Sequence, residues 1–233
     1  MSAKHIPSYE GNLRAHRIDI PACISQCSGI RVFGRRLKSL VFTTDVAILR
    51  NVNSDAVIAV YPFTPQPSIT RAILSCADMP VFVGVGGGVT RGGRVVGLAI
   101  DAERAGAFGV VVNAPTSNEV VGMLKRVLDI PVVVTVVSDK TDVSARIEAG
   151  ADILNVSGAQ HTPAIVGSIR EKFPDVPIIA TGGPTEETIL ETIHAGANAI
   201  TYTPPSNGEL FAQSMARYRR ELDERDLRET EEQ

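Results

Sequence analysis

Eight short apolar runs recur between Leu40 and Thr203, each bounded by turn-forming residues. Most are apolar at nearly every position, which is typical of parallel strands buried on both faces. Segments of helical periodicity, such as Arg94 to Ala105, separate most of them. This alternation predicts an α/β fold, a closed eight-stranded parallel (β/α)8 or TIM barrel. The runs begin near Leu40, Asp55, Pro80, Gly109, Pro131, Asp152, Pro177 and Ala199.

An internal repeat supports the barrel. Three runs follow an apolar-Pro pair and three follow Ala-Gly-Ala, and the two signals alternate along the chain. A proline at the start of a strand loses little, and a glycine closes a helix easily in a left-handed conformation. An open doubly wound sheet is the alternative, but eight strands favour closure. The signals are Met79-Pro80, Ile130-Pro131 and Val176-Pro177, and Ala105–Ala107, Ala149–Ala151 and Ala195–Ala197.

The two ends differ from the repeat. Residues 1–37 show no clear strand and carry a basic patch, so we expect an arm that closes the bottom of the barrel or meets a neighbouring subunit. Its apolar segment Ile20–Ile24 needs cover, which predicts a homo-oligomer. Residues 38–220 form the barrel domain and 221–233 a charged tail, read as a solvated helix or a partner contact. Ser206 and Glu209 predict a capping box. The basic patch comprises Arg31, Arg35, Arg36 and Lys38.

Composition sets limits on function. The 233 residues are 44% hydrophobic and 21% charged with net charge −3, so neither nucleic acid nor an anionic membrane is an expected partner. No apolar run approaches the ~20 residues of a membrane span, and residues 1–12 lack the apolar core of a signal peptide. We therefore expect a cytoplasmic protein whose three cysteines, Cys23, Cys27 and Cys76, are free thiols.

The turn after the seventh run is the strongest ligand signal. In barrels the chemistry lies at the carboxyl ends of the strands. Gly182 and Gly183 follow an apolar strand and precede a helix, so their backbone can approach a phosphate at the helix N-terminus. Pro184 suits the first helical turn, and Thr185 can cap it or donate its hydroxyl. A simple tight turn is the alternative. Tyr202 and Thr203, after the eighth run, are further candidate ligand-binding residues.

A second glycine-rich turn follows the third run. Gly86, Gly87 and Gly88 precede Arg91, and they form either a flexible loop or a lid and anion nest that takes its charge from Arg91. The spacing fits neither the dinucleotide fingerprint nor the Walker A motif. No cofactor is therefore expected.

Titratable candidates are few. Asp45 ends the first run, as a general base or as the cap of a following helix. His161 is a candidate or an exposed loop residue, and Asn113 and Asn155 end alternate runs, where they can orient a polar ligand. We find no His/Asp metal cluster, no paired carboxylates and no strand lysine for a Schiff base, so no metal site is predicted.

The segments Ile178–Gly183 and Ala195–Ile200 resemble the phosphate-binding barrels, among them thiamin-phosphate synthase, the N-acylglucosamine-6-phosphate 2-epimerases and the phosphogluconate aldolases. The resemblance implies a phosphate grip at the seventh and eighth strands. The chain departs from that pattern at Thr203-Pro204-Pro205-Ser206, where the family usually has a Gly-Ser pair. Because proline has no N–H, half of the usual phosphate cup is put in doubt.

The longer run from Arg31 to Pro205 looks like a group of bacterial barrels labelled only "hydrolase", through Phe42–Asp45, Tyr61–Pro67 and Gly84–Gly88. In outline it is also similar to the glycerol-3-phosphate-responsive antiterminator, a barrel that senses a ligand and acts on RNA. We therefore expect an enzyme that acts on a small phosphorylated metabolite by proton transfer, as an isomerase, epimerase or lyase. A hydrolase and a non-catalytic sensor are the alternatives.

Overall fold

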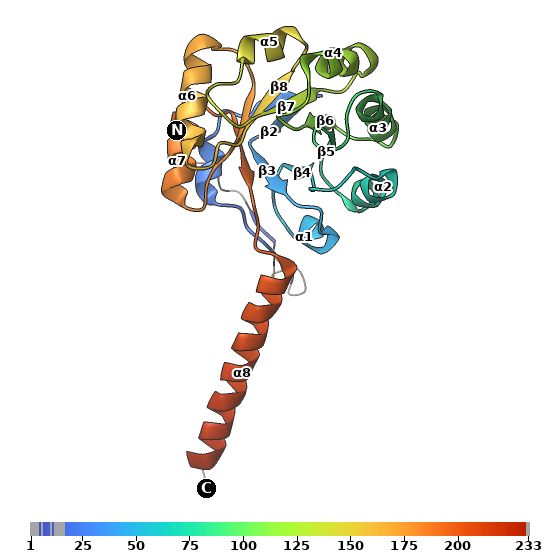
Figure 1. Ribbon diagram of the computed structural model, residues 1–233. Coiled ribbons are helices and arrows are strands. Elements are labelled where there is room, and N and C mark those ends of the chain that lie inside the picture. The colour runs from blue at the N-terminus through green and yellow to red at the C-terminus, as the bar shows by residue number, and fades with distance from the viewer. Residues whose placement is uncertain (1–4, 6, 10, 12–16, 232–233) are drawn as a thin grey trace.

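The computed structural model describes residues 5, 7–9, 11 and 17–231. Eight parallel strands form a closed barrel in the order β10-β3-β4-β5-β6-β7-β8-β9, which confirms the predicted fold (Figure 1). Each strand begins within one residue of the predicted position. Their bounds are β3 (Ser39–Phe42), β4 (Ala56–Ala59), β5 (Val81–Gly86), β6 (Gly109–Val112), β7 (Val132–Val136), β8 (Ile153–Val156), β9 (Ile178–Thr181) and β10 (Ala199–Tyr202).

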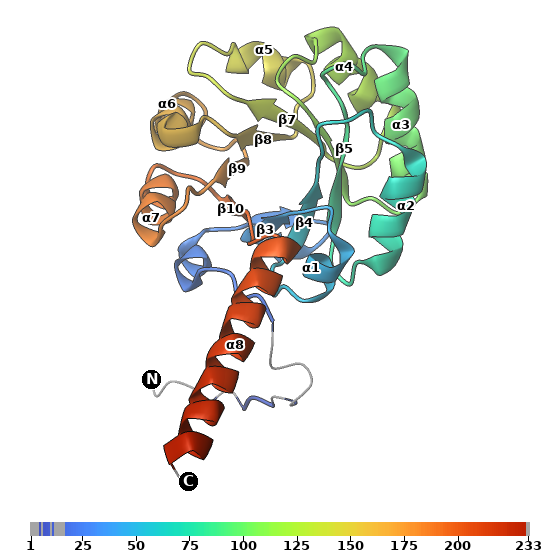
Figure 2. The ribbon, with the colours of Figure 1, turned by 60° about the horizontal axis from the view of Figure 1, so that its bottom comes forward.

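In the described residues, seven α-helices surround the barrel and an eighth extends away from it (Figure 2). A short 3-10 turn, η3 (Ala159–His161), precedes α6. The bounds of the helices are α1 (Val46–Arg50), α2 (Pro67–Cys76), α3 (Gly93–Arg104), α4 (Asn118–Val127), α5 (Val143–Glu148), α6 (Thr162–Lys172), α7 (Glu186–His194) and α8 (Asn207–Glu231).

The two faces of the strands serve two separate cores. Outward-facing residues such as Val57, Val110 and Leu154 are buried between the barrel and its helices. Inward-facing residues such as Phe82, Val133 and Ile179 fill the lower part of the barrel. Because both faces are buried, nearly every strand position is apolar, which explains the continuous runs in the sequence.

The glycines of the internal repeat end helices, as predicted. The prolines mark the starts of strands, but each lies one residue before its strand and not at its first residue. Pro80, like its two counterparts, lies one residue before its strand, and its carbonyl accepts from the backbone N–H of Val57 on the neighbouring strand at 2.8 Å. Gly150 closes α5 with φ of 111°, a conformation that side-chain-bearing residues rarely adopt. These local preferences therefore mark where each helix ends and each strand begins.

The expectation of no strand before Leu40 was wrong. Two short strands, β1 (Ile30–Val32) and β2 (Arg35–Leu37), form an antiparallel hairpin, and β3 itself begins at Ser39. The two turn residues, Phe33 and Gly34, have φ of 44° and 80°. A hairpin turn with both residues at positive φ usually contains Asn-Gly or Asp-Gly, so a phenylalanine there hides the signal. Residues 1–4, 6, 10 and 12–16 of the predicted arm lie outside the described residues.

The hairpin closes the bottom of the barrel, one of the two roles expected for the arm. Its buried residues Ile30, Val32 and Leu37 join the inner core. Phe33 packs edge to face on Phe108, which precedes β6, with ring centroids 5.1 Å apart. The arginines of the basic patch lie on the exposed face of the hairpin.

The apolar segment that suggested a homo-oligomer is covered within the chain. It forms the 3-10 helix η2 (Ala22–Gln26), which packs on α7, and Ile24 is fully buried. Upstream of η2, Ile18 pairs with Val52 just after α1. Residues 17–27 therefore fill the space between α7 and α1, seen in dark blue in Figure 2, and this segment gives no reason for oligomerisation.

Helix α8 extends away from the barrel as one rod (Figure 1, Figure 2). The predicted capping box is confirmed, because Glu209 accepts from the backbone N–H of Ser206 at 2.7 Å and Ser206 Oγ accepts from that of Glu209 at 3.3 Å. The boundary drawn at residue 220 does not coincide with a structural break, since the helix continues to Glu231. In the described part of the chain, no helix has the length and apolar character needed to span a membrane.

Candidate functional site

The barrel interior changes character at its carboxyl-terminal mouth. Below the mouth the inward-facing residues are apolar, whereas the inward positions one step higher on β7 to β10, and just after β6, carry hydroxyl or amide groups. Asn155 donates to Thr135 Oγ1 at 3.4 Å, and Thr181 donates to Ser157 Oγ at 3.3 Å. We call this set the polar wall: Asn113, Thr135, Asn155, Ser157, Thr181 and Thr201.

One hydroxyl of the polar wall has no protein partner. Thr201 is 7% exposed, and its Oγ1 makes no hydrogen bond to any described residue. A buried hydroxyl left unpaired costs about 1–3 kcal/mol. The position could hold valine, as the outward-facing strand positions do, so the threonine has a cost that core packing does not explain.

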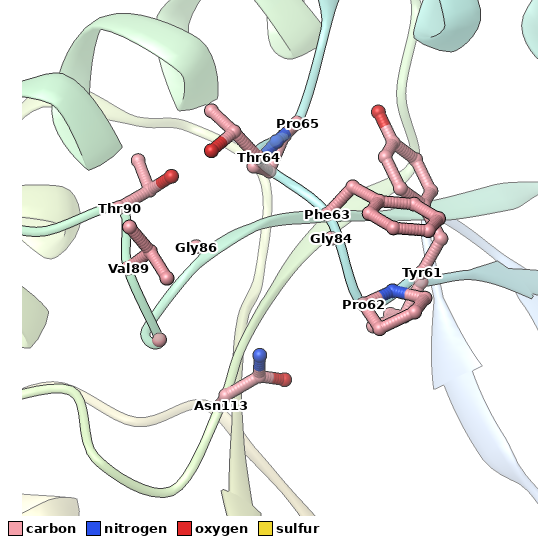
Figure 3. Close-up of a pocket in the computed structure, with 12 residues that line it drawn as sticks. Tyr61, Pro62, Phe63, Thr64, Pro65, Gly84, Gly86, Val89, Thr90 and Asn113 are labelled. Atoms are coloured by element: carbon pink, nitrogen blue, oxygen red, sulfur yellow. The ribbon is translucent and has the colours of Figure 1, made fainter.

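The opposite side of the mouth is a small pocket between the loops after β4 and β5 (Figure 3). It encloses about 70 Å³, and none of its twelve lining residues is charged. Phe63 and Val89 stand on opposite sides of its opening and are 74% and 94% exposed. The Asn113 side chain points into the space between them. The pocket thus offers apolar cover and one amide.

The β5–α3 turn is built for a close backbone approach. Gly86 and Gly87 have φ of 145° and 105°. A Cβ on Gly87 would lie 2.2 Å from Thr116 Oγ1, a second buried hydroxyl without a partner among the described residues. Gly88 faces open space. Only glycine fits the first two positions, so the predicted glycine run is required by the turn itself.

The start of α3 is uncapped and basic. Its N-cap, Gly92, has no side chain to bond the first N–H groups, and the first turn holds no acidic residue. Arg91 donates Nε to the Gly88 carbonyl at 2.9 Å, which ties the guanidinium to the glycine run. Arg91 and Thr116 line a pocket of about 250 Å³ that contains no carboxylate. Free N–H groups, a helix dipole and a cation together favour an anion.

The β9–α7 turn has the opposite character. Thr185 caps α7 and Thr188 completes a reciprocal box: Thr188 N–H donates to Thr185 Oγ1 at 3.3 Å and Thr185 N–H to Thr188 Oγ1 at 3.2 Å. Glu186 and Glu187 occupy the first helical turn. Hydrogen bonds from its own backbone N–H and from Thr185 hold the pKa of Glu187 below its usual value. Pro184 lies before the cap, so the expectation that it belongs to the first helical turn was wrong.

Tyr202 and Thr203 lie beside this turn. Together with Gly183 and Thr185 they line a cavity of about 830 Å³, which extends from the mouth along the first turns of α7 and α8. Three carboxylates, those of Asp19, Glu186 and Glu209, line this cavity, and no lysine or arginine does. A Cβ on Gly182 would lie 2.8 Å from both Ile189 and Ile200, so this glycine also lets the helix pack on the strand.

Asp45 and His161 differ in their surroundings, because Asp45 caps a helix and His161 is exposed. Asp45 is half-buried at the N-cap of α1, where Oδ1 accepts from the N–H groups of Ala47 and Ile48 at 2.8 and 3.3 Å. The capping role is thus observed; its other oxygen, Oδ2, has no hydrogen-bond partner among the described residues. His161 is exposed, with Nε2 3.4 Å from the Gln160 amide nitrogen, and lines neither mouth cavity.

Thr201 and Thr116 are not among the site residues predicted from the sequence. Strand parity places Thr201 inward two positions after Ala199, but parity does not reveal that its hydroxyl lacks a partner. No group of three or more His, Cys, Asp or Glu side chains converges within the described ranges.

No protein-family model matches the chain. Part of it is similar to two inosine-5'-monophosphate dehydrogenases, 38% identical over 64 residues in Chlorobaculum parvum and 40% over 70 residues in Halalkalibacterium halodurans. These regions make up 26% and 28% of this chain but 13% and 14% of the relatives, so the chain covers only a small part of their length.

Solved structures match over most of the barrel. A putative phosphonomutase from Burkholderia cenocepacia has a TM-score of 0.58 at 16% identity, covering 80% of this chain and 92% of its own. A phosphonopyruvate hydrolase has the same TM-score and identity, covering 82% and 83%. A mandelate oxidase reaches 0.61 at 16% identity, covering 76% and 68%. The chain has the TIM-barrel fold.

Proposed function

We propose that this protein is an enzyme that converts a small phosphorylated metabolite at the carboxyl-terminal mouth of its barrel. The observation that carries the proposal is the polar wall with its unpaired Thr201 hydroxyl. A protein that needs only a stable barrel gains nothing from burying an unsatisfied group, whereas a polar substrate supplies the missing partner. The similar solved structures are named as a mutase, a hydrolase, a synthase and an oxidase, and these names favour an enzyme.

The phosphate of the substrate is proposed to bind at the β5–α3 turn. Arg91 supplies a cationic group there, and the uncapped N-terminus of α3 supplies N–H groups. The β9–α7 turn, where the resemblance to phosphate-binding barrels would place the phosphate, has a filled cap and a carboxylate-lined cavity. Carboxylates at a helix N-terminus already occupy the positive end of the helix dipole and repel a further anion, so the acidic turn is the weaker candidate.

The proposed chemistry is proton transfer, with Asp45 as the base. Its Oδ1 is held by two backbone N–H groups, which orient the carboxylate, while Oδ2 is left to accept a proton. Asn113 and Asn155 orient the substrate from the polar wall. Isomerisation, epimerisation and elimination all need this step.

The test incubates the protein with a panel of phosphorylated sugars, triose phosphates and acyl phosphates, and follows both the melting temperature and product formation by NMR. A panel member should raise the melting temperature and be converted. Asp45→Asn should still bind it without turnover, because asparagine caps a helix as well as aspartate but is no base. Turnover that survives in Asp45→Asn would remove Asp45 from the mechanism.

Thr201→Val tests whether the unpaired Thr201 hydroxyl binds the ligand. It removes the unpaired hydroxyl, so the free protein should be equally or more stable while ligand stabilisation falls. Thr192→Val is the matched control: Thr192 is also buried, but its hydroxyl donates to the Thr188 carbonyl at 2.8 Å. This control should lose stability and keep binding. If Thr201→Val destabilises the free protein as much as Thr192→Val does, the polar wall has a structural role.

A non-catalytic sensor is the second candidate. It is favoured by the lack of any charged side chain in the polar wall and in the small mouth pocket. The same panel separates the two functions, because binding to any member without turnover of any member supports the sensor.

A further inference from the structure

Helix α8 carries an apolar stripe that its own chain leaves exposed. The stripe consists of four large side chains, each between 44% and 67% exposed. Their spacing of four, three and four residues places them on one face of the helix, as in the seam of a coiled coil. The stripe is Phe211, Met215, Tyr218 and Leu222.

The barrel has no free place for this helix. Residues 17–27 already fill the space between α7 and α1, beside the point where α8 leaves (Figure 2). The capping box at Ser206 and the ion pair between Arg217 and Glu221, 3.7 Å apart, support the helix locally. A projecting helix with an exposed apolar seam is nevertheless only marginally stable in water, because most helical stability comes from packing.

We propose that α8 pairs with α8 of a second copy of this chain in an antiparallel dimer whose twofold axis passes between Met215 and Tyr218. This register places Met215 of one copy opposite Tyr218 of the other, and Phe211 opposite Leu222. Three residues further out on each helix, Gly208 lies opposite Arg225. Six layers result, and the same surface meets itself, as twofold symmetry requires.

Size and charge select the antiparallel direction. A parallel pair in register would set Gly208 against Gly208, leaving a gap, and Arg225 against Arg225, with like charges opposed. In the antiparallel pair the long Arg225 crosses the smallest residue of the seam and reaches Glu209 beside it. Glu209 is exposed, and the two hydrogen bonds from Ser206 that hold its pKa below the usual value both go to Oε2.

The distribution of charge along the helix agrees with this direction. Residues 207–216 contain a single charged side chain, Glu209, whereas residues 217–231 are rich in arginine, glutamate and aspartate. Antiparallel pairing sets the nearly neutral beginning of each helix against the charged end of the other. It also sets the positive end of one helix dipole beside the negative end of the other.

Light scattering after size-exclusion chromatography of the full chain measures whether the protein dimerises. The wild type should show a mass that doubles from 24.8 kDa as the concentration rises through the micromolar range. Met215→Glu with Leu222→Glu should remain at 24.8 kDa with an unchanged melting temperature of the barrel. Arg220→Glu, on the outer face of the helix, is the control and should still dimerise. A monomeric wild type, or a dimer that survives the double substitution, overturns the proposal.

Disulfide trapping tests whether the two α8 helices pair antiparallel. The variants are made in a Cys76→Ser background, because Cys76 is partly exposed whereas Cys23 and Cys27 are buried. An equal mixture of Phe211→Cys and Leu222→Cys chains should cross-link under mild oxidation. Leu222→Cys alone should not, because the two copies of residue 222 lie eleven residues apart along the axis, about 16 Å at 1.5 Å per residue. Efficient cross-linking of Leu222→Cys alone would show a parallel pair and overturn the register.

Discussion

The β5–α3 and β9–α7 turns look alike in sequence and differ in what they can hold. Both join a buried strand to a helix through glycines at positive φ. At α7 a threonine cap and two glutamates occupy the helix start, whereas at α3 the start is uncapped and flanked by Arg91. Glycines determine how closely a ligand can approach a turn, but the cap and the charges of the first helical turn decide whether an anion is favoured there.

The largest expected effect comes from adding one methyl group to each turn. Gly87→Ala and Gly183→Ala both force a side chain into positive φ, with Cβ contacts of 2.2 and 2.6 Å to a threonine oxygen. Each should lower the free energy of unfolding by about 1–3 kcal/mol in urea titrations. We expect only Gly87→Ala to abolish binding of inorganic phosphate in calorimetry.

The proposed phosphate site depends on this difference in phosphate binding between Gly87→Ala and Gly183→Ala. A Gly183→Ala variant that remains folded and loses phosphate binding would place the anion at α7. Backbone amide shifts sharpen the result, because phosphate should move the signals of Gly87 and Gly93 and leave those of Gly183 and Thr185 in place.

A smaller effect is expected from the charge beside the β5–α3 turn. Arg91→Met keeps the length of the side chain and removes the cation, so phosphate affinity should fall about three- to tenfold, as for an anion that stays partly exposed. Arg104→Met makes the same change in the last turn of α3 and should leave the affinity unchanged. Equal losses in both variants would indicate a general effect of net charge.

The smallest effect concerns the acidic cap of α7. Hydrogen bonding to the ionised form lowers the pKa of Glu187, so the carboxylate stabilises the fold above its unfolded pKa. That contribution is lost as the pH falls through the lowered folded pKa. Glu187→Gln should therefore melt slightly below the wild type at pH 7, and the two curves should converge in acid. A difference that is constant with pH would mean that the carboxylate charge does not support the cap.

Part of the site could be predicted from sequence because it depends on local rules. Gly86, Gly87 and Gly183 occupy turns that demand positive φ, and Ser206 and Glu209 have the spacing of a capping box. Thr201 was not selected, because whether a buried hydroxyl has a partner depends on neighbours from other strands. The preference for the α7 turn likewise came from its glycines and its place in the barrel, and neither shows a cap that is already filled.

The sequence by itself determined the barrel and where its strands begin, since continuous apolar runs, prolines before strands and glycines after helices act over a few residues each. Tertiary structure decided the rest. The β1–β2 hairpin closes the barrel with a phenylalanine at positive φ that no turn rule anticipates. Residues 17–27 occupy the space between α7 and α1, so α8 projects with its apolar stripe exposed. Such outcomes depend on which apolar segments pack against the same face of the barrel. That is decided only when the whole chain is packed.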